Sequence, residues 1–176
     1  MTFKIDRLLL MLIVGTLTSC ALPTAHFPHL QQQQAPYDRR LERLQKEKDK
    51  LSRLTDPVDR SKSDIVISEI LLSLAGDAVK SGEPEVLGKR LNEYIDTIRD
   101  AHQGLTKNRD PRSKPKGFKE FEIALRRQIN MLNDLSKSVS FDQREPVDRA
   151  KQEASDIRDD IFKALFGEQN APSHKS

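Results

Sequence analysis

The sequence predicts an all-α protein, an up-and-down bundle of four to five helices. Three observations point to this class. Apolar residues recur at helical spacing in successive segments, an acidic residue followed by proline opens several of them, and no segment shows sustained alternation of apolar and polar residues. The composition agrees, because charged residues make up 32% of the chain and aromatic residues only 5%, as expected for helices with wide solvated faces.

The first predicted helix, residues 38–54, is strongly charged. Its apolar residues form a narrow stripe, with Lys48 where another apolar residue would fall: Tyr37, Leu41, Leu44, Leu51 and Leu54. Four acids are outnumbered by seven bases: Arg39, Arg40, Arg43, Lys46, Lys48, Lys50 and Arg53. We interpret the segment as a peripheral helix with charge pairs between residues three or four apart. A coiled coil or a contact with an anionic surface is the alternative.

The second predicted helix begins at Asp56 and Pro57 and forms the centre of the bundle. Asp56 can accept a hydrogen bond as the N-cap residue, and Pro57 suits the first helical position, where its missing N–H would be unpaired anyway. From Ile65 to Val79 the segment is apolar on nearly every face, which is typical of a helix surrounded by others. Ser81-Gly82 ends it.

Three further helices follow, each with one apolar stripe. The third begins at Glu83-Pro84, ends before Thr106, and carries Leu87, Leu91, Tyr94, Ile98, Ala101 and Leu105. The fourth carries Phe118, Phe121, Leu125, Leu132, Leu135 and Val139, widened by Ile129. A loop from Ser140 to Glu145 precedes the last, which begins at Pro146, carries Val147, Ala150, Ala154, Ile157, Ile161 and Ala164, and closes with Leu165 and Phe166 before Gly167.

A short sequence occurs twice, at the starts of the second and last helices. Pro57-Val58-Asp59-Arg60 recurs as Pro146-Val147-Asp148-Arg149, with an acid before each proline and a matching lysine at Lys62 and Lys151. Capping explains the acid, the proline and the aspartate but not the valine, arginine and lysine. Three interpretations remain open: two similar helix starts, a duplicated helical hairpin, or a paired surface that a partner recognises.

The N-terminus has the proportions of a secretion signal. Lys4 and Arg7 precede an apolar run, Leu8 to Leu17, that is too short to cross a bilayer, which needs about 20 residues. The segment ends in Leu17-Thr18-Ser19-Cys20, which resembles the lipobox of bacterial lipoproteins. The resemblance covers about twenty residues. An ordinary signal peptide with an incidental cysteine is the alternative.

The lipoprotein resemblance implies cleavage before Cys20, acylation of the Cys20 thiol and amine, and attachment to a membrane on its exported side. Several acyl chains give stable attachment, whereas one is marginal. In Gram-negative lipoproteins an aspartate after the cysteine commonly signals retention at the inner membrane. Ala21 stands there instead and favours the outer membrane in such a host.

Four regions follow from these assignments. Residues 1–19 form the signal peptide, residues 20–36 a lipidated flexible tether, residues 37–167 the helical domain and residues 168–176 a disordered tail. The tether prediction depends on its prolines and on the run Gln31–Gln34, which has no apolar period. Removing the signal lowers the net charge only from +3 to +2, which gives no reason to expect nucleic acid as a partner.

The sequence contains no catalytic or cofactor signature. Cys20 is the only cysteine, so no intramolecular disulfide is expected, and neither a phosphate-binding loop nor a metalloprotease or serine-hydrolase motif occurs. We expect no cofactor and no metal. Glu69 lies among apolar residues, where a buried carboxyl group could act as a general acid, and His102 is the one histidine in a predicted helix. A hydrolase or small-ligand carrier with a pocket near Glu69 and His102 is therefore the alternative function.

The segment Thr106–Gly117 is the strongest candidate for binding. It holds five basic residues against one acid, Asp110: Lys107, Arg109, Arg112, Lys114 and Lys116. Basic residues near an anionic envelope surface are attracted to it, although a solvated connector between helices would have the same composition. The favoured function is a tethered, non-enzymatic adaptor that contacts an envelope protein or an anionic envelope polymer.

Overall fold

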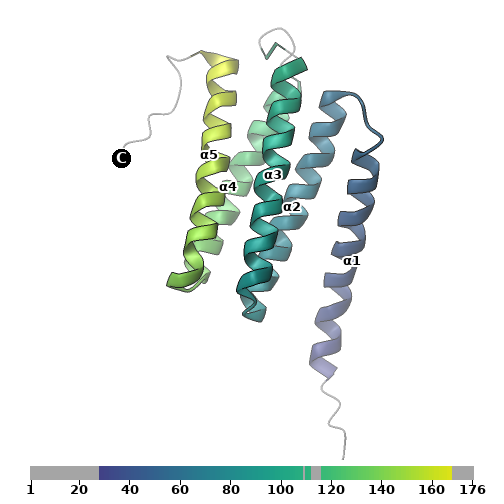
Figure 1. Ribbon diagram of the computed structural model, residues 1–176, viewed down its shortest axis with the longest axis vertical. Helices are drawn as coiled ribbons and strands as arrows, with labels where there is room; N and C mark the ends of the chain where they lie inside the picture. The colour runs from purple at the N-terminus through teal and green to yellow at the C-terminus, as the bar shows by residue number, and fades with distance from the viewer. Residues whose placement is uncertain (1–27, 109, 112–115, 168–176) are drawn as a thin grey trace, which may run out of the picture.

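The chain folds as a bundle of five α-helices (Figure 1). The structure is a computed structural model, and it describes residues 28–108, 110–111 and 116–167, with side chains from residue 37 onward except Asn108. Its helices are α1 (Pro28–Leu51), α2 (Pro57–Ser81), α3 (Pro84–Asn108), α4 (Phe118–Ser138) and α5 (Arg144–Phe166), with a short 3-10 helix, η1 (Phe141–Gln143), before α5. No strand occurs in the part described, so the predicted all-α bundle is confirmed.

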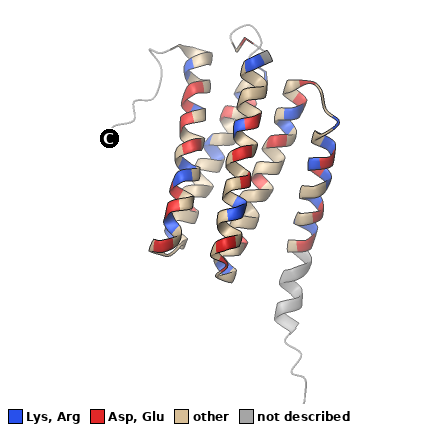
Figure 2. Cartoon of the chain, in the orientation of Figure 1, with Lys and Arg blue, Asp and Glu red and all other residues tan. Residues whose placement is uncertain are grey.

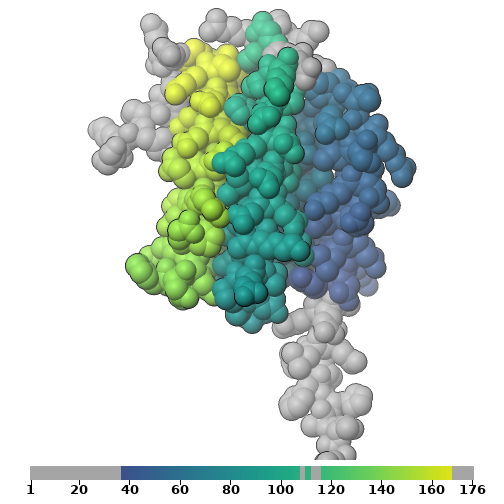
Figure 3. Space-filling view, in the orientation of Figure 1, coloured from purple at the N-terminus to yellow at the C-terminus, as the bar shows by residue number. Residues whose placement is uncertain are grey.

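The helices alternate in direction, and α2 is the central one. It packs against α1, α3 and α4, while α5 closes the bundle by packing on α3 and α4. Helix α1 lies at the edge beside α2, on the side of the molecule away from α5 (Figures 1 and 3). The prediction that the apolar second helix is central is therefore confirmed.

Both ends of α2 form as the sequence predicts. The Asp56 carboxylate accepts hydrogen bonds from the backbone N–H groups of Val58 (2.9 Å) and Asp59 (3.1 Å), which would otherwise have no partner in the first turn. Gly82 ends the helix with φ 69°, a left-handed conformation that costs glycine little.

The predicted apolar stripes form the core. All six stripe residues of α3 are buried, as are Phe118, Phe121, Leu125 and Leu132 of α4. Helix α5 contributes Val147, Ala150, Ala154, Ile157 and Ile161. Full burial of a large apolar side chain is worth about 1.5–3 kcal/mol, so these stripes supply most of the stability. Helix α1 contributes one fully buried side chain among its described residues, that of Leu44.

Four predicted boundaries were wrong. Helix α1 begins at Pro28, so residues 28–36, assigned to the tether, are helical; glutamine is a good helix former, and the missing apolar period did not indicate coil. The same helix ends at Leu51 and not at Leu54. Helix α3 runs to Asn108, and α5 begins at Arg144 because η1 leads directly into it. Residues 1–27 and 168–176, with the predicted signal, Cys20 and tail, lie outside the described residues.

The repeated sequence is only partly repeated in structure. Val58 and Val147 are both buried, and the lysine of each copy pairs with its aspartate, Lys62 with Asp59 at 2.9 Å and Lys151 with Asp148 at 3.5 Å. The arginines differ. Arg60 donates to the carbonyls of Leu51 and Leu54 and fixes the α1–α2 turn, whereas Arg149 donates to Asn92 of α3. Only the first copy has a side-chain cap.

Candidate functional site

The predicted basic loop connects α3 to α4 at one end of the bundle (Figure 1). Lys107 is exposed in the last turn of α3 and is therefore helical, while Lys116 is exposed just before α4. Arg109, Arg112 and Lys114 lie outside the described residues. The structure thus places two of the five predicted basic residues, both on the surface at the same end.

The last residue of this connection is fixed against the core. Gly117 has φ 92°, and a Cβ atom there would lie 3.0 Å from a methyl group of Val58 and 3.2 Å from one of Leu105. Only glycine fits such a close approach in this conformation. Its carbonyl accepts a hydrogen bond from the Phe121 N–H (2.9 Å) and so begins α4. Lys116 is consequently held at a defined position on the end of the bundle.

The chain enters the bundle at the opposite end from the basic loop. Helix α1 begins there and runs the length of the molecule before the turn into α2 (Figure 1). Its 24 residues correspond to about 36 Å of helix. The start of α1 and the basic residues Lys107 and Lys116 are therefore separated along the long axis of the bundle.

Glu69 and His102 have different neighbours. Glu69 of α2 accepts a hydrogen bond from Arg127 of α4 at 2.8 Å and is partly exposed. His102 of α3 is half-buried beside α5; burial lowers its pKa, and the carboxylates of Asp160 and Glu153 partly oppose that shift. Glu69 is thus paired with a basic residue of another helix, and His102 is partly buried. Their different neighbours give no support to a shared site.

A buried chain of hydrogen bonds links three helices, and sequence reasoning missed it. The Tyr94 hydroxyl donates to Gln128 Oε1 (3.2 Å), and Gln128 Nε2 donates to Ser68 Oγ (2.8 Å). All three side chains are fully buried. A signal was present: the apolar stripe of α4 skips from Leu125 to Leu132, and Gln128 fills the missing core position. The chain satisfies its own polar groups and sets how α2, α3 and α4 align.

Another buried polar group lies near the start of α2. Asp64 is 4% exposed, and Ser61 and Ser63 beside it are buried as well. Burial raises the pKa of the Asp64 carboxyl group to about 7; Arg60 opposes the shift and Asp100 of α3 adds to it. Ser61, Asp64 and Ser68 are three and four residues apart, and that spacing puts polar residues on a core face.

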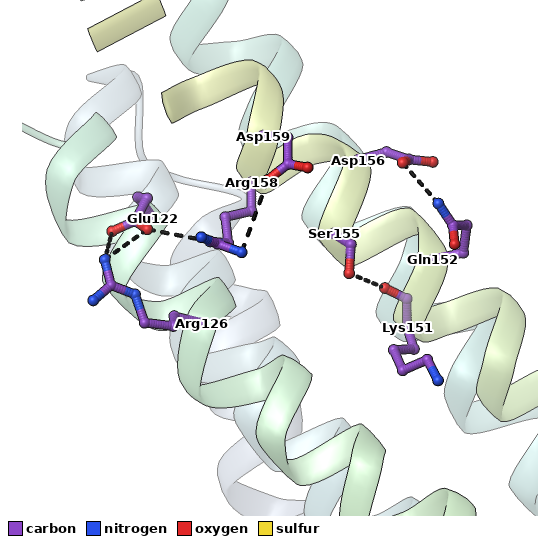
Figure 4. A network of polar contacts seen from close by, with 8 residues as sticks. All are labelled: Glu122, Arg126, Lys151, Gln152, Ser155, Asp156, Arg158 and Asp159. Atoms are coloured by element: carbon purple, nitrogen blue, oxygen red, sulfur yellow. Dashed lines mark hydrogen bonds and ion pairs between the residues drawn. The ribbon is translucent and has the colours of Figure 1, made fainter. Parts of the chain in front are cut away.

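An ion-pair network joins α4 to α5 (Figure 4). Glu122, only 5% exposed, accepts two hydrogen bonds of 2.8 Å from Arg126 and one of 3.3 Å from Arg158. Arg158 also pairs with Asp159 at 3.8 Å. Two cations thus compensate a carboxylate that would be costly to bury alone. The network therefore stabilises the packing of α4 on α5.

Several of the buried polar groups are therefore paired with one another. In residues 28–108, 110–111 and 116–167, no three side chains of the metal-binding types come together. Within the same ranges no helix combines the length and the apolar character that crossing a bilayer requires. The features facing solvent are the charged helix surfaces (Figure 2), the basic end of the bundle and four large exposed apolar side chains, those of Ile123, Met131, Phe141 and Phe166.

Comparisons with known proteins gave no match: neither a family model, nor a curated protein, nor a solved structure matches this chain.

Proposed function

We propose that the chain is a membrane-tethered, non-enzymatic adaptor of the bacterial cell envelope. Its lipid anchor is Cys20, and its helical bundle binds an envelope protein or an anionic envelope polymer. In a Gram-negative host the outer membrane is the favoured location. One observation carries the proposal: the chain enters the bundle at one end, and the basic residues Lys107 and Lys116 are exposed at the other.

The interior supports an adaptor better than an enzyme. The core is formed by apolar stripes, and three of its polar members, Tyr94, Gln128 and Ser68, are hydrogen-bonded to one another. The two residues of the alternative hypothesis, Glu69 and His102, interact with different helices. The surface therefore carries the proposed activity, and the basic end is its centre.

The anchor is tested by replacing Cys20. Cys20→Ser should leave an unlipidated protein that no longer fractionates with membranes, and mass spectrometry of the mature N-terminus measures the modification. Ala21→Asp is the matched control, because it should keep the lipid and, in a Gram-negative host, move the protein to the inner membrane. An unmodified Cys20 in the wild-type protein would refute the anchor.

The basic end is tested by crosslinking and affinity purification of the lipidated protein. The variant replaces its five basic residues by Gln: Lys107, Arg109, Arg112, Lys114 and Lys116. The control replaces five exposed basic residues outside this set, four of them at the opposite end of the bundle and Lys163 in the last turn of α5: Lys80, Lys89, Lys137, Arg144 and Lys163. We expect the first variant alone to lose partners. An identical set of partners from both variants would show that the loop is a connector, and turnover of a substrate by a protein that captures nothing would refute the adaptor.

A further inference from the structure

Helix α1 presents a straight row of basic side chains on its outer face. The row, hereafter the basic row, consists of Arg39, Arg43, Lys46, Lys50 and, in the turn that follows, Arg53, and all five are exposed. The four helical members are spaced 4, 3 and 4 residues apart and lie within an arc of about 60° on the helix. Arg53 follows three residues after Lys50, in the turn. The apolar residues that pack on the bundle, Tyr37, Leu41, Leu44 and Leu51, lie on the opposite side of the helix.

The basic row has few partners in the protein. Lys50 pairs with Glu47 at 3.1 Å, whereas Arg39, Arg43, Lys46 and Arg53 form no ion pair with any described residue. The two other bases of the helix differ, because Arg40 binds Asp77 and Ser73 of α2, and Lys48 pairs with Glu93 of α3 at 3.2 Å. Like charges three or four residues apart destabilise a helix slightly. Apart from the Lys50–Glu47 pair, the charges of the basic row are therefore not matched by acids of the protein, and an external anion could pair with them.

The shape of this surface favours a flat partner that carries many negative charges. Helix α1 is a convex edge of the molecule (Figure 3), and the acids Asp38, Glu42 and Asp49 lie along one flank of the basic row and not within it. A bilayer leaflet can meet all five cations of a straight convex edge at once. A flexible acidic chain could also contact this edge, but a convex surface would not enclose it, so the bilayer is the better fit.

The position of α1 in the chain favours the same partner. Helix α1 begins at Pro28, eight residues after Cys20, and this segment can span at most about 26 Å. A helix tethered so closely meets a high local concentration of headgroups. An acyl anchor combined with a basic segment is also the pairing that gives stable membrane attachment.

We propose that the basic row of α1 lies on the anionic headgroups of the leaflet to which the chain is tethered. This proposal rests on the proposed function for the lipid anchor at Cys20 and for the identity of that membrane. The row then forms a second, electrostatic attachment that turns the side of α1 toward the bilayer and leaves α5, on the other side of the molecule, facing away (Figure 1).

The test uses vesicles and an unlipidated protein. Residues 20–176 carrying Cys20→Ser are mixed with vesicles of phosphatidylcholine and phosphatidylglycerol, in a ratio of about 7:3, or of phosphatidylcholine alone, and binding is measured by co-sedimentation at low salt. We expect binding only to the anionic vesicles. Replacing all five residues of the basic row by Gln should weaken it at least about tenfold.

Two matched variants make the result specific. The control with Gln at Lys80, Lys89, Lys137, Arg144 and Lys163 removes the same charge from other helices and should weaken binding less than about threefold. Arg39→Lys, Arg43→Lys and Arg53→Lys together keep the charge and should keep the binding. Circular dichroism verifies that each variant is folded.

Three outcomes would overturn the proposal. They are an equal loss for both Gln variants, equal binding to both kinds of vesicle, and binding to soluble polyglutamate that depends on the basic row and is tighter than binding to vesicles. The last outcome would assign the row to an acidic polymer. Because the protein tested carries no lipid, these results are independent of whether Cys20 is acylated in cells.

Discussion

Asp64 carries a carboxyl group into the packed side of α2, and its protonation is coupled to folding. Its pKa is about 7 in the folded chain, mainly because burial disfavours the charged form, against a usual value of 3.8. At pH values between these two pKa values, the folded protein therefore keeps a proton on Asp64 that the unfolded chain has released. The stabilising effect of the neutral group is complete below the unfolded pKa and is lost as the pH rises through the folded pKa.

Asp64→Asn should remove this pH dependence. The amide remains neutral, so at about pH 8 the variant should be more stable than wild type by up to about 4 kcal/mol, the free-energy equivalent of the pKa difference. At about pH 4 the two should differ little. Urea unfolding at both values measures the effect, and the exposed Asp134→Asn is the control. A gain of equal size at both values would contradict protonation of Asp64 as its cause.

The Tyr94 hydroxyl is important because Gln128 has no other donor for its Oε1 among the contacts described. Burial raises the pKa of Tyr94, so the hydroxyl stays protonated and donates. Tyr94→Phe should cost about 1–3 kcal/mol, since it leaves a buried acceptor without a partner. Adding Gln128→Leu removes that acceptor, and the double variant should lose less than the sum of the two single variants, measured by thermal melts. Strict additivity would show that the hydrogen bond makes no difference.

At the scale of the element, the two copies of the repeated sequence should differ in their contribution to stability. Asp56 accepts two backbone hydrogen bonds at the start of α2, so Asp56→Ala should cost about 1 kcal/mol. Glu145 lies inside the first turn of α5, where it has only a favourable position near the helix dipole, and Glu145→Ala should cost clearly less. Paired denaturation curves measure both variants. Equal losses would mean that Asp56 does not act as a cap.

The sequence could predict the first helix start but not the second. Asp56-Pro57 caps α2 as expected because the turn before it is extended, with ψ 127° at Asp56. The same dipeptide pattern at Glu145-Pro146 is already helical, because η1 brings the chain into α5 two residues earlier. The capping residues of a helix do not determine the conformation of the loop before it, and here that conformation decided where the helix begins. The apolar stripes were predicted better, since helical spacing alone determines which residues of α3, α4 and α5 face inward.

At the scale of the whole molecule, α2–α5 form a complete bundle without α1. Leu44 is the one buried core residue that the described part of α1 supplies, beside the partly buried Tyr37, Leu41 and Leu51, whereas α5 supplies five buried apolar residues. A chain that begins at Thr55 should therefore remain helical and unfold cooperatively, at a lower melting temperature than the full chain. A chain that ends at Ser138 loses α5 and should not fold. Circular dichroism melts compare the two, and loss of structure in both would show that α1 is integral.

The sequence could not predict this arrangement of neighbours, because the spacing of apolar residues fixes which face of a helix is buried but not against which helix. The sequence also predicted that α1 is a charged peripheral helix, but it did not show which of its basic residues pair with other helices and which remain exposed. Arg40 and Lys48 reach Asp77, Ser73 and Glu93 on other helices, and such long-range partners appear only once the helices are placed. The basic end was predicted as a loop, yet Lys107 belongs to α3.

The peripheral position of α1 has a mechanical consequence. Its N-terminal end lies at the end of the bundle opposite to the turn that joins it to α2, so tension applied through the N-terminus would separate the two helices progressively, starting farthest from that turn. The ion pair of Arg40 would break before that of Lys48, and the load would reach α2–α5 only after the whole of α1 had come away. A protein built in this way lengthens under tension while its core stays folded.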